Sequence, residues 1–363
     1  MKKLGAILAL SLAAVVACDP GSLPPGEPTG ALGFTVRPGA IEYPASDGSV
    51  SAYEGLMTLV PVDGCVLGFG SYRTGNSGSV PATWLGGDGC TRLVLGPLPG
   101  RGLEQAATAF AATAAVPGAD GAVIGLDQWF YRRDRSGEVV RLFRPELDRK
   151  VVALARAGRN LVGVGTRPGP GGAKPVAWVS GDEGRTAREI ELPSDGPGYW
   201  SPNAIAAEGA QVLVAGSLGA SPLVWASGDA GETWTVSKVQ SDLQIGTVLR
   251  VGGNWLLAGG NAAGAVVMTG APGNWRLTDP AALGDGRVIG GTVDKAGKPV
   301  LIGERIERDS SASSRPCSVV WALGAGGWQR GELGCPRDTV SAAASLPDGR
   351  VLLASSRDLW IRP

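Results

Sequence analysis

The chain has 363 residues, including 58 glycines and 26 prolines, and its 33 basic residues balance its 33 acidic ones. A neutral chain is not typical of nucleic-acid-binding proteins, whose affinity depends on a basic surface. The chain contains no histidine, which excludes Ser-His-Asp and Cys-His catalysis and every histidine-ligated zinc site.

The N-terminus has the pattern of a bacterial lipoprotein signal peptide. Two lysines precede an apolar run over residues 4–16, and the sequence Val-Val-Ala-Cys ends at Cys18. A basic start, an apolar run of this length and small residues before a cysteine are typical of a cleaved export signal. We therefore predict a signal peptide over residues 1–17, cleavage before Cys18 and lipidation of that cysteine.

The segment after the lipidated cysteine is predicted to be a tether. Residues 18–30 are rich in proline and glycine and show no apolar periodicity, so they are expected to extend by roughly 3 Å per residue. No later stretch approaches the roughly 20 continuous apolar residues that a membrane-spanning helix needs. We expect a cell-envelope protein, periplasmic or surface-exposed, that contacts its membrane through the N-terminal lipid.

An eight-residue motif, S-x-D-x-G-x-T-W, marks a repeat in the chain. One complete copy stands 47 residues after a copy that lacks the tryptophan, and steps of 47 residues lead from Trp178 back to Tyr131 and Trp84. A fixed period of this length predicts a repeat architecture. The matching residues are Ser180, Asp182 and Gly184 in the first copy and Ser227, Asp229, Gly231, Thr233 and Trp234 in the second.

Short strand-like runs separated by turn residues predict one four-stranded sheet per repeat, and hence an all-β, seven-bladed propeller over residues 31–363. The last unit, 339–363, supplies three strands, so an N-terminal strand within residues 32–44 is expected to complete it and close the ring. A six-bladed ring is the alternative, if the second unit is not a blade. The six complete blades are expected at 56–99, 105–148, 149–195, 198–242, 243–286 and 287–338.

The two motif copies resemble the Asp boxes of the BNR-repeat proteins, which include sialidases, sortilin-type receptors and a lipid-anchored photosystem II assembly factor. The resemblance implies a sialidase-like propeller with the motif turns on the face opposite the active site. Asp182 and Asp229 are therefore expected to be structural, accepting hydrogen bonds from turn amides. Sialidases also carry an Arg-Ile-Pro segment, from which this chain departs because Pro38 follows Arg37 directly.

Apart from Cys18 the chain has four cysteines, and an exported protein can form disulfides. Three pairings are possible. We prefer Cys65 with Cys90 and Cys317 with Cys335, because each pair lies within one predicted blade and closes a short loop worth roughly 3 kcal/mol. The cysteines show no C-x-x-C spacing, so the sequence predicts neither a metal site nor a cofactor.

A ligand is expected on the face formed by the loops that enter each first strand and those that join the second and third strands. Long loops on one face of a rigid scaffold are a usual place for binding. We expect this rim to be locally basic. The candidate rim residues are Tyr72, Arg73, Arg167, Tyr199, Trp200, Arg287, Arg305 and Arg337.

The expected function is a binding or scaffolding module at the cell envelope, with an envelope protein or a glycan as partner and no role in nucleic-acid binding. No catalytic residue is assigned. The alternative is a sialidase-like glycoside hydrolase or a glycan-binding protein. In that case Arg149, Arg287 and Arg337, with Tyr199 and Glu54, offer the charge clamp that a carboxylate-bearing sugar needs.

Overall fold

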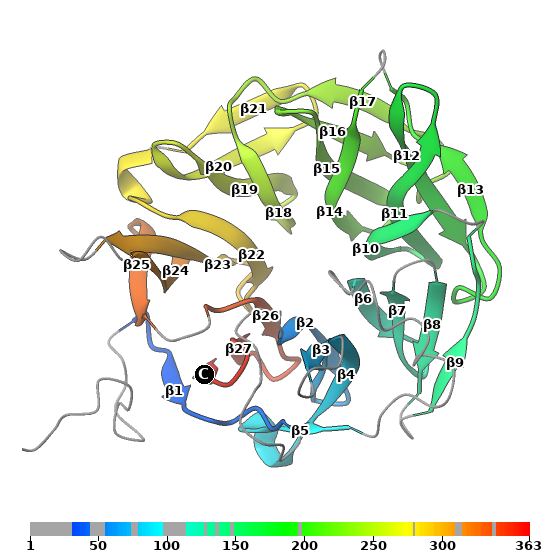
Figure 1. Ribbon diagram of the computed structural model, residues 1–363. Coiled ribbons are helices and arrows are strands. Elements are labelled where there is room, and N and C mark those ends of the chain that lie inside the picture. Colours follow the sequence, from blue (N-terminus) through cyan, green and yellow to red (C-terminus); the bar gives the residue numbers. More distant parts are fainter. Residues whose placement is uncertain are drawn as a thin grey trace, which may run out of the picture.

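The structure, a computed structural model, shows seven antiparallel four-stranded sheets arranged as blades around one axis (Figure 1). The predicted seven-bladed propeller is therefore confirmed, and the second unit is a blade. No helix in the described part of the chain is long and apolar enough to cross a membrane. The structure describes residues 31–43, 55–73, 79–96, 114–126, 129–134, 138–145, 149–194, 198–278, 280–308, 314–335 and 339–363.

Each blade is built from strands that are consecutive in sequence, running outward from the axis. The first three blades are β2 to β5 (Leu56–Val62, Cys65–Arg73, Ser79–Gly86, Leu93–Leu95), β6 to β9 (Ala114–Gly118, Gly121–Leu126, Trp129–Arg133, Val139–Arg141) and β10 to β13 (Lys150–Ala157, Asn160–Gly169, Gly172–Ser180, Arg188–Glu191). A 3-10 turn, Asp88–Cys90, precedes β5.

The remaining blades follow the same order. They are β14 to β17 (Trp200–Glu208, Gln211–Leu218, Ser221–Ser227, Thr235–Lys238), β18 to β21 (Gln244–Val251, Asn254–Asn261, Gly264–Ala271, Asn274–Leu277), β22 to β25 (Arg287–Val293, Pro299–Arg308, Ser314–Gly324, Gly327–Gly334) and β26 to β28 (Ala342–Ser345, Val351–Ala354, Leu359–Arg362). A second 3-10 turn, Pro280–Ala282, precedes β22.

The seventh blade joins the two ends of the chain. Its outermost strand, β1 (Thr35–Arg37), comes from the N-terminal segment and pairs antiparallel with β28, beside the C-terminus (Figure 1). The segment then reaches the first blade, where Ile41 forms a parallel bridge with Leu93 and the Leu93 amide donates to the Ala40 carbonyl at 2.8 Å. The N-terminal segment thus ties blade seven to blade one, as the sequence predicted.

Every blade buries a large side chain on its third strand. Six of these are aromatic and at most 1% exposed, and the seventh is Met268 at 5%. The indole N–H of Trp225 donates to the Pro193 carbonyl at 2.8 Å. Pro193 lies in the segment that arrives from the preceding blade. Such bonds orient neighbouring blades as well as satisfying a buried donor. The residues are Trp84, Tyr131, Trp178, Trp225, Met268, Trp321 and Trp360.

The two motif copies form nearly identical turns between third and fourth strands. Asp229 accepts from the Ser227 hydroxyl at 2.7 Å, the Thr233 amide at 2.9 Å and the Thr233 hydroxyl at 2.6 Å. Asp182 makes the same three bonds in the copy without tryptophan, at 2.7–2.9 Å. The aspartate network therefore shapes the turn whether or not the tryptophan is present.

These turns also link blades. Glu183 pairs with Arg156, on the first strand of its own blade, at 2.7 Å, and its carboxylate accepts from the Ala119 amide of the preceding blade at 3.4 Å. The side chain of Asn160 donates to the Ala230 carbonyl of the next blade at 3.2 Å. Because third-to-fourth and second-to-third connections lie at opposite ends of antiparallel strands, this face is opposite the predicted rim.

Acid is expected to weaken these turns. Hydrogen bonds from Thr233 hold the pKa of Asp229 at about 2, below its ordinary 3.8. A lowered pKa adds stability above the unfolded value, and this is lost as pH falls from about 4 to about 2. Urea unfolding should show Asp229→Asn to be less stable than the parent by roughly 0.5–1.5 kcal/mol at pH 7. That difference should shrink at pH 2, and a pH-independent difference would contradict the assignment.

Both local disulfides form. The Cys65–Cys90 pair has a Cα–Cα distance of 5.5 Å and the Cys317–Cys335 pair one of 4.0 Å. The first bridge lies on the face of the ring where blades three and four carry the motif turns, because Cys65 begins a second strand. The second lies toward the rim, because Cys335 directly follows a fourth strand. The preferred pairing is therefore confirmed, and each bridge joins residues at one end of its blade.

Candidate functional site

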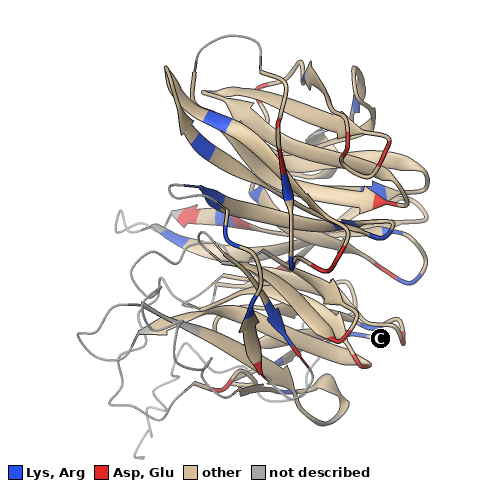
Figure 2. Ribbon diagram, turned by 90° about the vertical axis from the view of Figure 1, so that its right-hand side faces the viewer, with Lys and Arg blue, Asp and Glu red and all other residues tan. Residues whose placement is uncertain are grey.

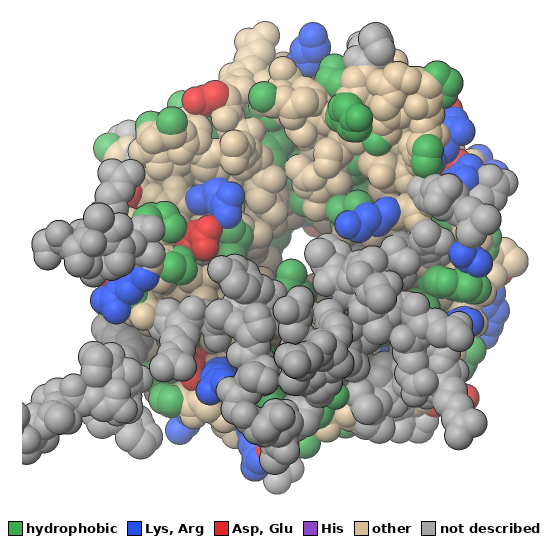
Figure 3. Space-filling model, viewed as in Figure 1, with side chains coloured by type: hydrophobic (Ala, Val, Ile, Leu, Met, Phe, Trp, Pro, Cys, Tyr) green, Lys and Arg blue, Asp and Glu red, His purple; other side chains and the backbone are tan. Residues whose placement is uncertain are grey.

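Within the residues that the structure describes, five inner strands carry a β-bulge close to the rim. The pairing of each with the second strand shifts register by one residue near its start. A bulge redirects a side chain, and bulges are common beside functional sites. They place one extra residue from each of these blades around the opening at the ring axis, which is visible from this face (Figure 3). The bulge residues are Met57, Val152, Asn203, Gly246 and Ile289.

A glycine on the second strand supports every one of these bulges. It follows the bulge residue by 13 positions in four blades and by 14 in the sixth. A Cβ atom on any of these glycines would lie 1.8–2.3 Å from a backbone carbonyl oxygen just before the bulge. Only glycine permits such a close backbone approach. The supporting glycines are Gly70, Gly165, Gly216, Gly259 and Gly303.

Three consecutive bulges border one pocket, named here the mouth pocket. It has a volume of about 540 Å³ and lies between blades four, five and six, with Asn203, Gly246 and Ile289 in its wall. The middle bulge residue is Gly246, where a Cβ atom would lie 2.3 Å from the Val288 carbonyl oxygen, so the backbones of blades five and six approach each other closely here. The polar side chains that line the mouth pocket are Asn203, Ser217, Asp242, Gln244 and Arg287.

The two charged groups of the mouth pocket are held by neighbours. Asp242 accepts from the Asn261 side-chain amide at 2.8 Å, and Arg287 donates to Glu304 at 2.8 Å while remaining 54% exposed. One hydrogen bond leaves the carboxylate and the guanidinium with further capacity. The pocket therefore offers donors and acceptors in fixed positions beside an apolar wall that includes Ile289.

Tyr199 stands at the edge of the mouth pocket. Its side chain is 75% exposed, and its carbonyl accepts from the amide of Gly219, a lining residue, at 3.1 Å. Of the aromatic rim candidates whose side chains the structure describes, Tyr199 is the exposed one. An exposed aromatic ring provides a stacking surface for a ligand.

Two rim candidates are buried, so the expectation that they face solvent is wrong. Trp200 is 2% exposed and packs against Trp225, with 6.0 Å between ring centroids. Tyr72 is 4% exposed, and burial raises its pKa above the ordinary value. Tyr72 lies near the end of β3 and Trp200 begins β14, both at the rim. The pleat of each strand turns these side chains between neighbouring blades. Neither supplies a contact surface for a ligand.

The rim arginines are paired with carboxylates, which corrects the expectation of a basic rim in the described residues. Arg167 pairs with Glu191, and Arg305 contacts Glu332 at 3.0 Å. Basic and acidic residues are both present on the blades in the side view (Figure 2). Arg73 ends β3, but its side chain, like Arg337 and Cys18, lies outside what the structure describes.

Sequence reasoning missed three lining residues of the mouth pocket: Asn203, Ser217 and Gln244. Each is an ordinary polar residue within or next to a strand, with no motif around it. A usable signal exists in the spacing from each bulge residue to its glycine. This spacing relates Asn203 to Gly216 and would have placed both at the rim end of their strands.

No protein-family model matches the chain, and no curated protein matches it in sequence. Its fold is similar to that of streptogramin B lyase, at 12% identity with a TM-score of 0.59, over 93% of this chain and 99% of that one. The extracellular domain of BT4673 from B. thetaiotaomicron is also similar, at 10% identity with a TM-score of 0.55, over 91% of this chain and 40% of that one. The class defined by these observations is a seven-bladed β-propeller.

Proposed function

We propose that the protein is a lipid-anchored binding module of the cell envelope that holds its ligand in the mouth pocket. The predicted signal peptide and Cys18 support export and anchoring. The observation that carries the binding role is the pocket itself, where side chains from three blades converge at the axis. A concave site with a few placed polar groups on a rigid scaffold is typical of ligand binding.

The lining favours a sugar unit as the bound group. Asn203, Gln244 and Asp242 offer amide and carboxylate groups to hydroxyls, and Arg287 adds a cationic donor. Tyr199 is joined to the lining residue Gly219 through its backbone carbonyl, and its exposed ring suits the apolar face of a sugar ring. These features support a glycan ligand, the class that the sequence left as an alternative.

The geometry favours binding over hydrolysis. Apart from sialidases, which use a tyrosine nucleophile, glycosidases generally use two carboxyl groups that flank the scissile bond. Among the described residues that line the mouth pocket, Asp242 is the one carboxylate. The charge clamp predicted for a sialidase-like site is also altered, because the Arg149 guanidinium donates two hydrogen bonds to the Glu189 carboxylate.

Saturation-transfer NMR with a panel of monosaccharides and disaccharides tests this proposal. We expect Gln244→Ala to weaken the bound sugar about tenfold, equivalent to the loss of about 1.4 kcal/mol, without a change in melting temperature. Gln211→Ala is the matched control, since Gln211 is exposed at the opposite end of its blade. Binding that is unaffected by Gln244→Ala, or a panel that contains no binder, would reject the sugar site.

A further inference from the structure

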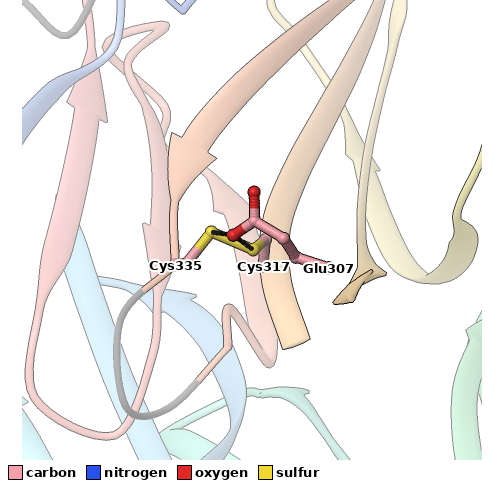
Figure 4. A group of neighbouring side chains, drawn as sticks. All are labelled: Glu307, Cys317 and Cys335. Atoms are coloured by element: carbon pink, nitrogen blue, oxygen red, sulfur yellow. Dashed lines mark hydrogen bonds between the residues drawn. A yellow bond between two sulfur atoms is a disulfide. The ribbon is translucent and has the colours of Figure 1, made fainter. Parts of the chain in front are cut away.

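A carboxylate lies against the disulfide of the sixth blade. Cys317 in β24 is joined to Cys335, which follows β25, and Glu307 on β23 points at both sulfur atoms (Figure 4). One oxygen of Glu307, Oε2, lies 3.5 Å from Cys317 Sγ and 3.3 Å from Cys335 Sγ. In the described part of the chain, this is the one group of at least three metal-ligand side chains whose ligand atoms all lie within 4.8 Å of one another.

Two arginines hold Glu307 in this position. Arg315 contacts Oε2 at 3.3 Å and Arg305 contacts Oε1 at 3.7 Å. Arg305 is itself fixed by Glu332 at 3.0 Å. The Glu307 side chain is 38% exposed, so an ion from solvent can reach it. The carboxylate is therefore positioned before any metal arrives, and Arg305, which the rim prediction assigned to a ligand, serves this position instead.

We propose that Glu307, Cys317 and Cys335 form a redox-gated site for a borderline-soft divalent cation such as Zn²⁺. Thiolate sulfur and carboxylate oxygen bind Zn²⁺ at about 2.3 and 2.1 Å, which places the two kinds of ligand roughly 3.6 Å apart in a tetrahedral site. The observed sulfur–oxygen distances of 3.3 and 3.5 Å already approach this value. Water fills the fourth position.

Reduction opens the site. A small dithiol reductant attacks the disulfide, its two thiols become a disulfide, and their two protons pass to Cys317 and Cys335. The separated sulfur atoms then move apart to roughly 3.8 Å, the spacing of two thiolates on one Zn²⁺. Cation binding releases the two protons, because thiolates rather than thiols are the ligands. Oxidation restores the disulfide and expels the cation.

The other disulfide supplies a matched control within the same molecule. In that pair, Cys90 Sγ lies 3.6 Å from the Gly64 carbonyl oxygen. That pair has the same redox chemistry without a carboxylate in the described surroundings. Any metal affinity that is common to both pairs would come from thiols alone, and any excess at the sixth blade reports on Glu307.

The experiment uses the full chain carrying Cys18→Ser, so that the fifth thiol is absent. One version adds Cys65→Ser and Cys90→Ser, and the other adds Cys317→Ser and Cys335→Ser. Each is titrated with Cd²⁺, before and after reduction by a phosphine, and sulfur-to-cadmium charge-transfer absorbance is recorded. Zn²⁺ affinity follows from competition with a chromophoric chelator, and near-ultraviolet circular dichroism of the tryptophans reports whether the ring is folded.

We expect the version that keeps Cys317 and Cys335 to bind one Cd²⁺ after reduction and none before. Glu307→Gln should lower its Zn²⁺ affinity at least about tenfold, and Zn²⁺ should raise its melting temperature only in the reduced state. The proposal is overturned if the reduced chain binds no cation or if Glu307→Gln has no effect. It is overturned as well if the version that keeps Cys65 and Cys90 binds the cation equally well. It is also overturned if reduction unfolds the ring, since the site needs three strands in place.

Discussion

Deletion of residues 32–44 is expected to aggregate or unfold the protein, whereas deletion of residues 19–30 is expected to leave its melting temperature unchanged. The first deletion removes β1 and exposes the edge of β28, which presents unpaired backbone groups in an open ring. It also removes Phe34 and Val36, which are 0% and 5% exposed in the core. The second deletion removes only the predicted tether.

A single substitution tests the same seam without a deletion. Phe34 packs among core residues of blades six and seven, and Arg362 stacks over its ring at 5.1 Å. We expect Phe34→Ala to cost about 3–5 kcal/mol in urea unfolding. Leu277→Ala is the control, because Leu277 is 55% exposed and should change stability by about 0.5 kcal/mol or less. Equal stability of the two variants would show that the N-terminal segment does not close the ring.

Gly216→Ala is expected to destabilise the fourth blade by about 1–3 kcal/mol and to distort the mouth pocket. The new Cβ atom would lie 2.3 Å from the Ser201 carbonyl oxygen and 2.9 Å from the Pro202 Cα atom. These are backbone atoms, which cannot rotate away as a side-chain atom can. The bulge that carries Asn203 must therefore shift, so sugar binding should fall together with the melting temperature.

Gly228→Ala is the matched control in the same blade. A Cβ atom there would meet nothing within 4 Å, and its backbone angles suit any residue. Melting curves from differential scanning calorimetry should therefore agree for Gly228→Ala and the parent protein. If Gly216→Ala has the same melting temperature as these two proteins, the close approach of the second strand to the bulge does not contribute to stability.

The repeating parts of this fold were predictable because they depend on local sequence. The 47-residue step from Trp84 to Tyr131 and Trp178 located the third strands, where all three residues are now found buried. The Asp229 motif located a turn, since its bonds run between residues at most four positions apart. The two disulfides followed from the same blade boundaries.

The exposure of rim residues was not predictable in this way. Tyr199 and Trp200 are neighbours in sequence, yet one is 75% exposed and the other 2%. Successive side chains of an extended segment point to opposite sides, and only the packing of Trp200 on Trp225 decides which side is inside. Likewise, the acidic partners that neutralise Arg167 and Arg305 stand on other strands, so residue counts on loops overestimated the positive charge of the rim.

By itself the sequence determined the class of fold, and it favoured seven blades, the closing strand and the local disulfide pairs, because period, turn chemistry and short loops are local properties. Only the tertiary structure decided the mouth pocket and the contact of Glu307 with the disulfide. Asn203, Gly246 and Ile289 come from three different blades. Their convergence depends on the curvature of the closed ring and on a register shift at each bulge. Neither is written in any single stretch of the chain, since both arise from packing between strands.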